Sequence, residues 1–140
     1  MLVVKREQRQ KMGDPAFVDR TAEHMREYHL PQVYDLEDDE LRFRVRHGVE
    51  KARRYGLTWE SSLTIFVSHM TTIHPAFDEQ PAIQAVLTDE KIPGDEKMQA
   101  LLGLVEDDDW EEAANQSDPA EYWERVHEEA GGSDAGKGDA

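Results

Sequence analysis

Apolar residues recur at steps of three and four positions in one segment after another, and proline or glycine separates the segments. The clearest segment runs from Asp38 to Tyr55, where the apolar residues fall within one sector of about 120° on a helical wheel. No segment alternates apolar and polar residues for long enough to predict a strand. We therefore expect an all-α protein: a compact bundle of about five helices with an acidic helical C-terminal extension and a disordered tail.

Capping residues, prolines and glycines predict where these helices begin and end. Gly56 is expected to leave the second helix in the left-handed conformation. The expected N-cap residues are, in chain order, Asp14, Asp38 or Asp39, Thr58, Asp109 and Asp118. The helical stripes that we expect to be buried include Phe17, Thr21, Met25 and Tyr28, then Trp59, Leu63, Phe66, Met70 and Ile73, and finally Met98, Leu101, Leu102 and Val105. The first residues are expected to form an extended lead-in at 2–4 and a short helix at 5–12.

The charge is unevenly distributed and predicts the domain organisation. The chain carries 31 acidic residues against 16 lysines and arginines, a net charge of -15. Thirteen of the acids and only two of the bases lie in 106–140. We therefore expect a helical bundle over 1–105, an acidic helical extension over 106–130 and a disordered tail over 131–140, because the tail carries no large apolar side chain.

Several classes of function are disfavoured by composition. A chain this acidic is poorly matched to a nucleic-acid backbone or an anionic membrane, so neither is an expected partner. No apolar run approaches the length of a membrane span or of the core of an export signal. The absence of cysteine excludes disulfides and thiolate chemistry and fits a cytoplasmic protein, which is our expectation for its location.

Chemistry-bearing motifs are also scarce. There is no His-Glu-x-x-His pair, no glycine-rich phosphate loop and no nucleophile elbow, so we expect no enzymatic activity and no cofactor. The six histidines leave one alternative open, namely a small metal-dependent enzyme or metal-binding protein that uses His69, His74 and nearby carboxylates.

The segment from Asp38 to Tyr55 carries six bases and an aromatic residue, Phe43, that points away from its apolar stripe, on a line with His47 and Arg54. Aromatic residues beside arginine are typical anchors of protein interfaces. One hypothesis is that the acidic extension folds back on this basic helix, with Trp110 or Trp123 packing near Phe43, and that salt loosens it. In the competing hypothesis the extension stays free to hold a basic partner. The candidate partner-binding residues are Phe43, His47, Arg54, Trp110 and Trp123.

One long motif and several short ones resemble a known group of proteins. The residues that carry this resemblance are 47–61 (HGVEKARRYGLTWES), Phe66-Val67 with Met70, Phe77-Asp78-Glu79 and 86–89 (VLTD), together with the helix from Phe17 to His29 that ends at Leu30-Pro31. Over 1–105 the chain resembles small, all-helical, poorly characterised bacterial proteins encoded beside type VI secretion spike and effector genes. His74-Pro75 stands where that group has a glycine-containing turn.

The resemblance implies an accessory role without a catalytic site. We expect a protein that binds another protein, either as an effector chaperone or adaptor or as an immunity protein. The expected partner is a secreted effector, a toxin domain or a spike component.

Overall fold

A computed structural model describes residues 15–139, with side chains described as far as residue 131. The described residues form eight α-helices, two short 3-10 helices and no strand, so the predicted all-α class is confirmed. The helices are α2 (Pro15–Tyr28), α3 (Leu30–Val33), α4 (Asp38–Arg54), α5 (Glu60–Thr72), η1 (Phe77–Glu79), α6 (Pro81–Leu87), η2 (Gly94–Glu96), α7 (Lys97–Leu104), α8 (Asp107–Ala114) and α9 (Pro119–Asp139). The segments expected at 2–4 and 5–12, and the expected cap Asp14, lie outside the described residues.

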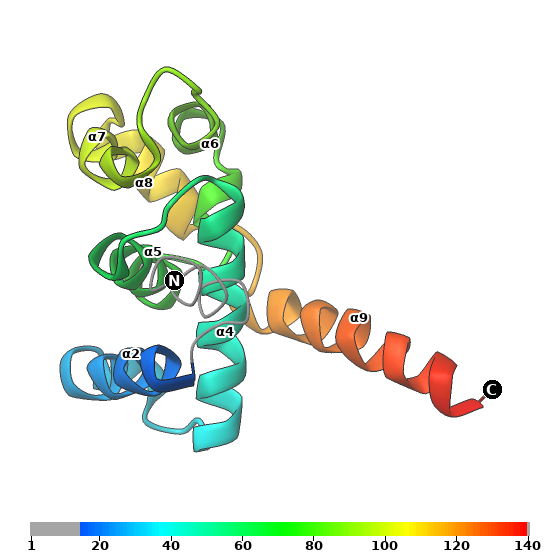
Figure 1. The fold of residues 1–140 in the computed structure, drawn as a ribbon. Coiled ribbons are helices and arrows are strands. Elements are labelled where there is room, and N and C mark those ends of the chain that lie inside the picture. Colours follow the sequence, from blue (N-terminus) through cyan, green and yellow to red (C-terminus); the bar gives the residue numbers. More distant parts are fainter. Residues whose placement is uncertain (1–14, 140) are drawn as a thin grey trace, which may run out of the picture.

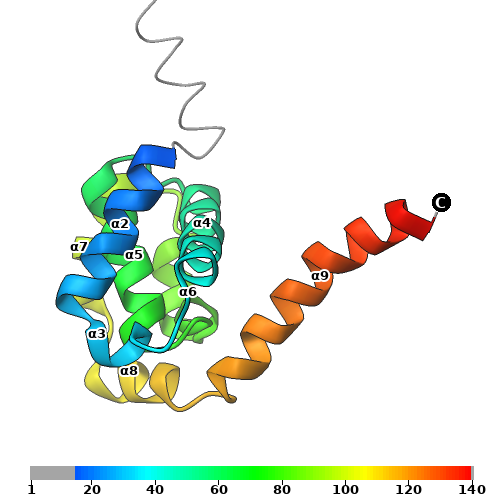
Figure 2. The same cartoon turned by 90° about the horizontal axis from the view of Figure 1, so that it is seen from below.

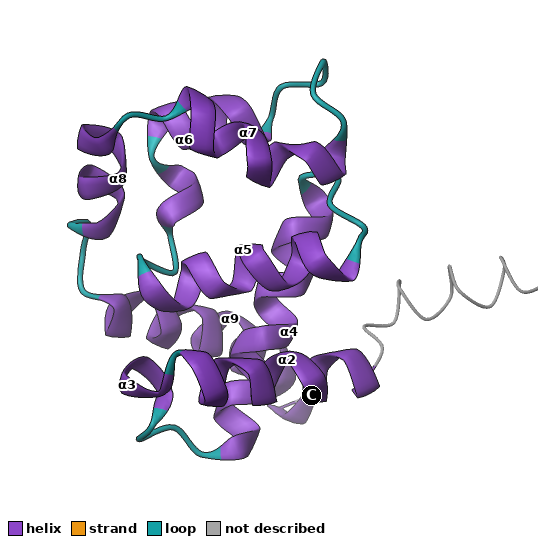
Figure 3. Cartoon of the chain, turned by 90° about the vertical axis from the view of Figure 1, so that its left-hand side faces the viewer, coloured by secondary structure: helices purple, strands orange, loops and turns teal. Residues whose placement is uncertain are grey.

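Helix α4 is the long axis of the fold. Helices α2 and α5 pack across it, and α6, α7 and α8 gather toward its C-terminal end (Figure 1). Helix α5 lies between α2 on one side and the α6–α7 pair on the other (Figure 3). Helix α9 contacts this body near its start and then projects away from it, as the two perpendicular views agree (Figures 1 and 2).

Two glycines allow α4 to pack and to end where it does. Gly48 is buried where α4 crosses α5, and a Cβ at this position would lie 3.0 Å from both Met70 Sδ and Val67 Cγ2. Gly56 has a φ of 94°, so the helix ends in the left-handed conformation that the sequence predicted. Acidic residues in the first turn of α4 and basic ones in its last turn complement the helix dipole.

At α4 and α5 the N-cap lies one residue from the predicted position, and at α5 a distant residue takes part. Glu37, rather than Asp38 or Asp39, is the N-cap of α4. Trp59, rather than Thr58, is the N-cap of α5, and the backbone N–H groups of Thr58 and Trp59 donate to Asp95 Oδ1 at 2.7 and 2.8 Å. Burial raises the pKa of Asp95, but the hydrogen bonds that its carboxylate accepts outweigh this effect and lower it. A carboxylate from η2 therefore caps α5 across 37 positions of sequence.

The capping box of α8 consists of Glu106 and Asp109, and Asp109 has a different role in it from the predicted one. Glu106 is the N-cap, and Asp109 is the third helical residue, whose side chain accepts from the Glu106 backbone N–H. The sequence placed Asp109 at the N-cap, three residues too late. The acidic run from Glu106 to Asp109 thus forms the first turn of a helix, where carboxylates interact favourably with the exposed N–H groups.

Three members of the predicted apolar stripes are exposed. Tyr28 is 63% exposed, Trp59 63% and Leu102 66%. Tyr28 is the last residue of α2 and Trp59 precedes the first turn of α5, so a helical wheel does not describe what covers them. Leu102 follows the buried Leu101 on α7, where it faces away from the core. Correct spacing placed these residues on the right helices but did not determine their burial.

The hydrophobic core includes part of the acidic extension. Ala113 of α8 and Tyr122 and Trp123 of α9 belong to the same buried cluster as Val45 and Phe66. The division expected at residue 105/106 therefore does not divide the core. No helix among the described residues is both long and apolar enough to cross a membrane.

The expected end of the last helix at Gly131 is wrong, because α9 continues to Asp139. Among the described residues Gly56 is the only one with a positive φ, so Gly131 keeps a helical backbone instead of forming a left-handed cap. The disorder expected over 131–140 stays a prediction, since side chains beyond 131 and the whole of Ala140 lie outside the described part of the chain.

Candidate functional site

Two neighbouring aromatic residues hold the start of α9 against α4. Tyr122 and Trp123 are only 5% and 7% exposed. The Trp123 ring meets the His47 ring edge-on, with 5.4 Å between centroids, and the Arg44 guanidinium carbon lies 4.8 Å from the Trp123 centroid. A guanidinium at this distance from an indole face makes a favourable cation–π contact. The residue that sequence analysis named, Trp123, thus anchors the extension to the basic helix.

Short polar contacts connect the Tyr122 hydroxyl to α4. Lys51 Nζ donates to the Tyr122 hydroxyl at 2.8 Å and to the Pro75 carbonyl at 3.0 Å. The Tyr122 hydroxyl also lies 2.7 Å from His47 Nε2. Because the ammonium group can only donate, the tyrosine proton is free to point at His47, whose Nε2 accepts it. One tyrosine of α9 therefore connects two side chains of α4.

The same lysine forms a buried ion pair with Asp78 of η1. Lys51 Nζ lies 2.7 Å from Asp78 Oδ1, and the Tyr55 hydroxyl donates to Asp78 Oδ2 at 2.7 Å. Asp78 is 1% exposed. Burial lowers the pKa of Lys51, and the Asp78 carboxylate offsets part of this effect. Burial also raises the pKa of both Tyr55 and Tyr122, so these hydroxyls remain protonated donors.

His47 stays neutral in this surrounding. Burial, followed by the positive charges of Lys51 and Arg54, lowers the pKa of His47 to about 4. A neutral imidazole can accept the Tyr122 proton, whereas an imidazolium cannot. The contact between α9 and α4 is therefore suited to neutral pH.

We expect this contact to weaken on acidification. Because the folded-state pKa of His47 lies below the unfolded value, the unfolded chain binds more protons between about pH 6.5 and 4, and stability falls as the pH falls through that range. From pH 7 to pH 5 the loss due to His47 should be about 1 kcal/mol, discounted for partial exposure. Urea unfolding of the wild type and of His47→Gln at both pH values measures it, because glutamine keeps an acceptor but does not titrate. An equal acid-induced loss in the two proteins would contradict this role.

The ring that covers Phe43 belongs to His127. The two rings stack with 4.0 Å between centroids and an interplanar angle of 11°. His127 Nε2 also donates to Glu40 Oε1 at 2.8 Å. Burial raises the pKa of Glu40, but hydrogen bonds from His127 and Arg44 outweigh this effect and lower it. The side chain that stacks on Phe43 is therefore His127, whereas Trp123 packs beside it on Arg44 and His47 of the same helix.

The contacts that hold α9 on α4 also differ in kind from those that the fold-back hypothesis assumed. An ion pair between α4 and α9 joins a base of the acidic extension, His127, to an acid of the basic helix, Glu40. The remaining contacts described above are aromatic or buried hydrogen bonds, which salt screens little. The opposite charges of the extension and the basic helix suggested that salt would loosen the extension. From these contacts we do not expect a strong effect of salt on the attachment of α9.

A groove of about 430 Å³ lies between α4 and the part of α9 that leaves the body. Three predicted partner-binding residues, Phe43, His47 and Arg54, line it together. Its other lining residues are Arg46, Glu50, Val126, Glu129 and Ala130. Charges of both signs thus surround a partly apolar floor, which is the composition of a polar interface rim around an apolar centre.

Trp110 lies elsewhere, on α8. Its ring meets the His69 ring edge-on with 5.6 Å between centroids, and His69 also contacts Phe77 in the same manner at 5.4 Å. Burial lowers the pKa of His69, so the imidazole remains uncharged. The fifth candidate residue therefore helps to hold α8 on the body and is not part of the groove.

The two histidines of the metal hypothesis, His69 and His74, make different kinds of contact. His74 is 2% exposed; its Nδ1 accepts from the Ala76 backbone N–H at 2.9 Å, and its Nε2 donates to the Ser117 carbonyl at 2.5 Å. Both nitrogens that could bind a metal are thus used by the backbone. Within the described part of the chain, no group of three or more His, Asp or Glu side chains could hold a metal ion.

Sequence analysis missed Lys51, Asp78, Tyr122 and His127 as parts of this site. Lys51 lies at the edge of the apolar stripe of α4, and Asp78 lies in one of the motifs that carry the family resemblance. Neither position indicates a buried ion pair, because the two residues are brought together by the turn that follows α5. The chain matches no model of a protein family, no curated protein sequence and no solved structure.

Proposed function

We propose that this chain is a non-enzymatic accessory protein that binds another protein through the groove between α4 and α9. The observation that carries the proposal is the geometry of α9. Its first turns are fixed by Tyr122 and Trp123, and the helix then projects from the body with Glu128 and Glu129 exposed beside the groove. A projecting acidic helix next to a groove with an apolar floor gives a partner two surfaces to contact.

The partner that this surface fits is a protein with a basic patch and an apolar anchor residue. The exposed carboxylates of α9 would steer a basic surface toward the groove. The anchor would contact Phe43 and Val126 on its floor.

The family resemblance gives this partner a setting. It implies a role beside a bacterial type VI secretion system, as an effector chaperone or adaptor or as an immunity protein. An adaptor binds an effector and a spike component together, whereas an immunity protein binds one toxin and blocks it. In either role the protein acts in the cytoplasm before the partner is exported or after a toxin has entered.

Co-expression with the proteins encoded beside it tests the proposal. We expect one of them to copurify at a fixed ratio and to bind the purified chain at micromolar concentration or below. Glu129→Lys, at the exposed edge of the groove, should weaken that binding at least tenfold, because it replaces an attractive charge by one that repels a basic partner. The matched control is Glu27→Lys on α2, which reverses an exposed acidic charge away from the groove and should change binding less than twofold.

Two results would contradict the proposal. One is that none of the neighbouring proteins binds. The other is that Glu129→Lys and Glu27→Lys behave alike. If a neighbouring protein does bind, inhibition of its toxic activity would assign the immunity role. A ternary complex with a spike component would assign the adaptor role.

A further inference from the structure

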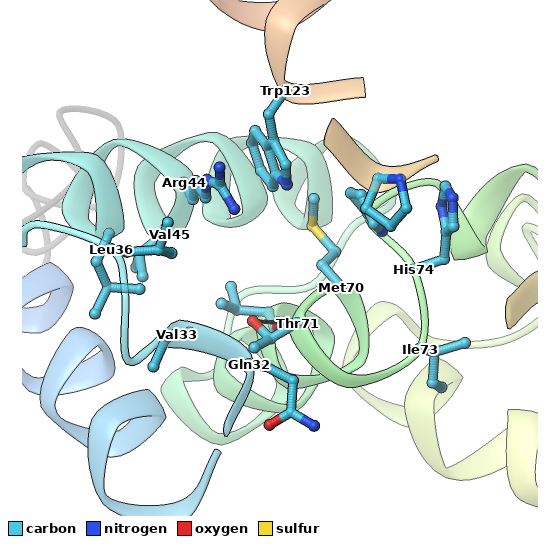
Figure 4. Close-up of a pocket in the computed structure, with 14 residues that line it drawn as sticks. Gln32, Val33, Leu36, Arg44, Val45, Met70, Thr71, Ile73, His74 and Trp123 are labelled. Carbon is cyan, nitrogen blue, oxygen red and sulfur yellow. Dashed lines mark hydrogen bonds between the residues drawn. The ribbon is translucent and has the colours of Figure 1, made fainter. Parts of the chain in front are cut away.

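A second cavity lies beside Trp123. It has a volume of about 220 Å³ and is enclosed by α3, α4, the end of α5 and the start of α9 (Figure 4). The lining residues used below are Arg44, Val45, Met70, Thr71, His74 and Trp123. The cavity shares Trp123 with the α4–α9 contact but none of the residues of the groove.

Most of the wall is apolar and rigidly placed. Val45 and Met70 are 1% and 4% exposed and come from two helices that pack closely at Gly48. The Trp123 ring forms one side of the cavity (Figure 4). An apolar cavity of about 150 Å³ is sufficient to bind benzene. This cavity therefore has room for a small ring or a short alkyl chain.

The polar groups of the cavity wall determine which polar group a ligand can carry in addition to its apolar part. Both nitrogens of His74 are already bonded to backbone groups, and the Thr71 hydroxyl donates to the Val67 carbonyl at 2.9 Å. Arg44 is the one lining residue, among those described, that carries a formal charge. Its Nε donates to Glu40 at 2.8 Å, while the guanidinium lies beside Trp123 at the cavity (Figure 4).

We propose that this cavity binds a small amphipathic anion, namely a short-chain alkyl carboxylate. The alkyl chain would occupy the space between Val45 and Met70, and the carboxylate would accept hydrogen bonds from the terminal nitrogens of Arg44. A guanidinium offers paired donors that match the two oxygens of a carboxylate. In a chain with a net charge of -15, a single cation in the wall of an apolar cavity selects an anion from neutral molecules of the same size. This site is independent of the protein-binding function proposed above.

Calorimetric titration of the full chain with sodium octanoate tests the proposal, with 1-octanol as the neutral probe of equal length. We expect saturable binding of octanoate at a ratio of one, at least tenfold tighter than that of octanol. Binding should also change the fluorescence of Trp123, which Trp123→Phe would identify as its source. Because the ligand binds the folded state, it should raise the melting temperature of the protein.

Two variants change the cavity itself. Thr71→Leu adds volume inside it and leaves the helix intact, so octanoate should bind at least tenfold more weakly. Arg44→Gln removes the cation and should reduce octanoate binding at least tenfold while leaving octanol unaffected. Arg42→Gln is the matched control, because Arg42 lies on the same helix, pairs with Asp39 and does not line the cavity. Circular dichroism establishes that each variant is folded.

Three results would overturn the proposal. The first is no octanoate binding at millimolar concentration. The second is equal binding of octanoate and octanol, and the third is octanoate binding by Arg44→Gln that equals that of Arg42→Gln. In the last two cases the cavity would be a site for apolar molecules in general rather than for an anion.

Discussion

Leu63→Asp should prevent the protein from folding at neutral pH. Leu63 is 1% exposed on α5, the helix between α2 and the α6–α7 pair. The substitution removes the burial of a leucine side chain and places a carboxylate within the cluster of buried apolar side chains. The combined cost, about 4 kcal/mol or more, is a large part of the 5–15 kcal/mol that stabilises a domain of this size. Circular dichroism and thermal melting measure the result.

Leu102→Asp is the matched control for this prediction. The helical pattern assigns Leu102 to a buried stripe just as it assigns Leu63, but the structure leaves Leu102 66% exposed. We therefore expect its melting temperature to stay within a few degrees of the wild type, since exposed substitutions change stability by about 0.5 kcal/mol or less. A folded Leu63→Asp, or an unfolded Leu102→Asp, would show that the packing of α5 or α7 described here is incorrect.

This pair of leucines illustrates how far periodicity predicts the fold. Along α4 the predicted stripe is buried almost throughout, because a long helix crossed by several others is covered along its whole inner face. Periodicity is weaker at the ends of helices and on short ones, where one face has no neighbour. That is why Tyr28, Trp59 and Leu102 were assigned to the core and are exposed. The sequence specifies which residues share a face and leaves open what covers that face.

The candidate site was predictable to a similar degree. Phe43, His47 and Arg54 share one side of a single helix, so a helical wheel suffices to group them. Trp123 was named, together with Trp110, as an aromatic residue of the acidic extension that could pack against the basic helix. The Lys51–Asp78 pair, the contacts of the Tyr122 hydroxyl and the cap that Asp95 supplies to α5 extend across 27 to 75 positions. No local pattern encodes such contacts.

Asp78→Asn should destabilise the protein by about 3 kcal/mol, because it leaves the Lys51 ammonium group buried without its counter-ion. The asparagine keeps the shape of the side chain and an acceptor for the Tyr55 hydroxyl, so the effect reports mainly the lost charge. Lys51 also donates to Tyr122, and the loss should therefore extend to the attachment of α9 and alter the fluorescence of Trp123. Urea unfolding at pH 7 measures the free energy, with the exposed Asp35→Asn as a control that should change it by about 0.5 kcal/mol or less.

The double variant Lys51→Met, Asp78→Asn separates the value of the pair from the cost of breaking it. Removing one member of a buried ion pair costs far more than replacing both, because the cost arises from the charge that remains. We expect the double variant to be more stable than Asp78→Asn alone by about 1.5 kcal/mol or more, and the single variant Lys51→Met completes the cycle that gives the coupling energy of the pair. If the two single effects were additive, Lys51 and Asp78 would not interact. The polar connection from η1 through α4 to α9 would then have to run through His47 and Tyr122 alone.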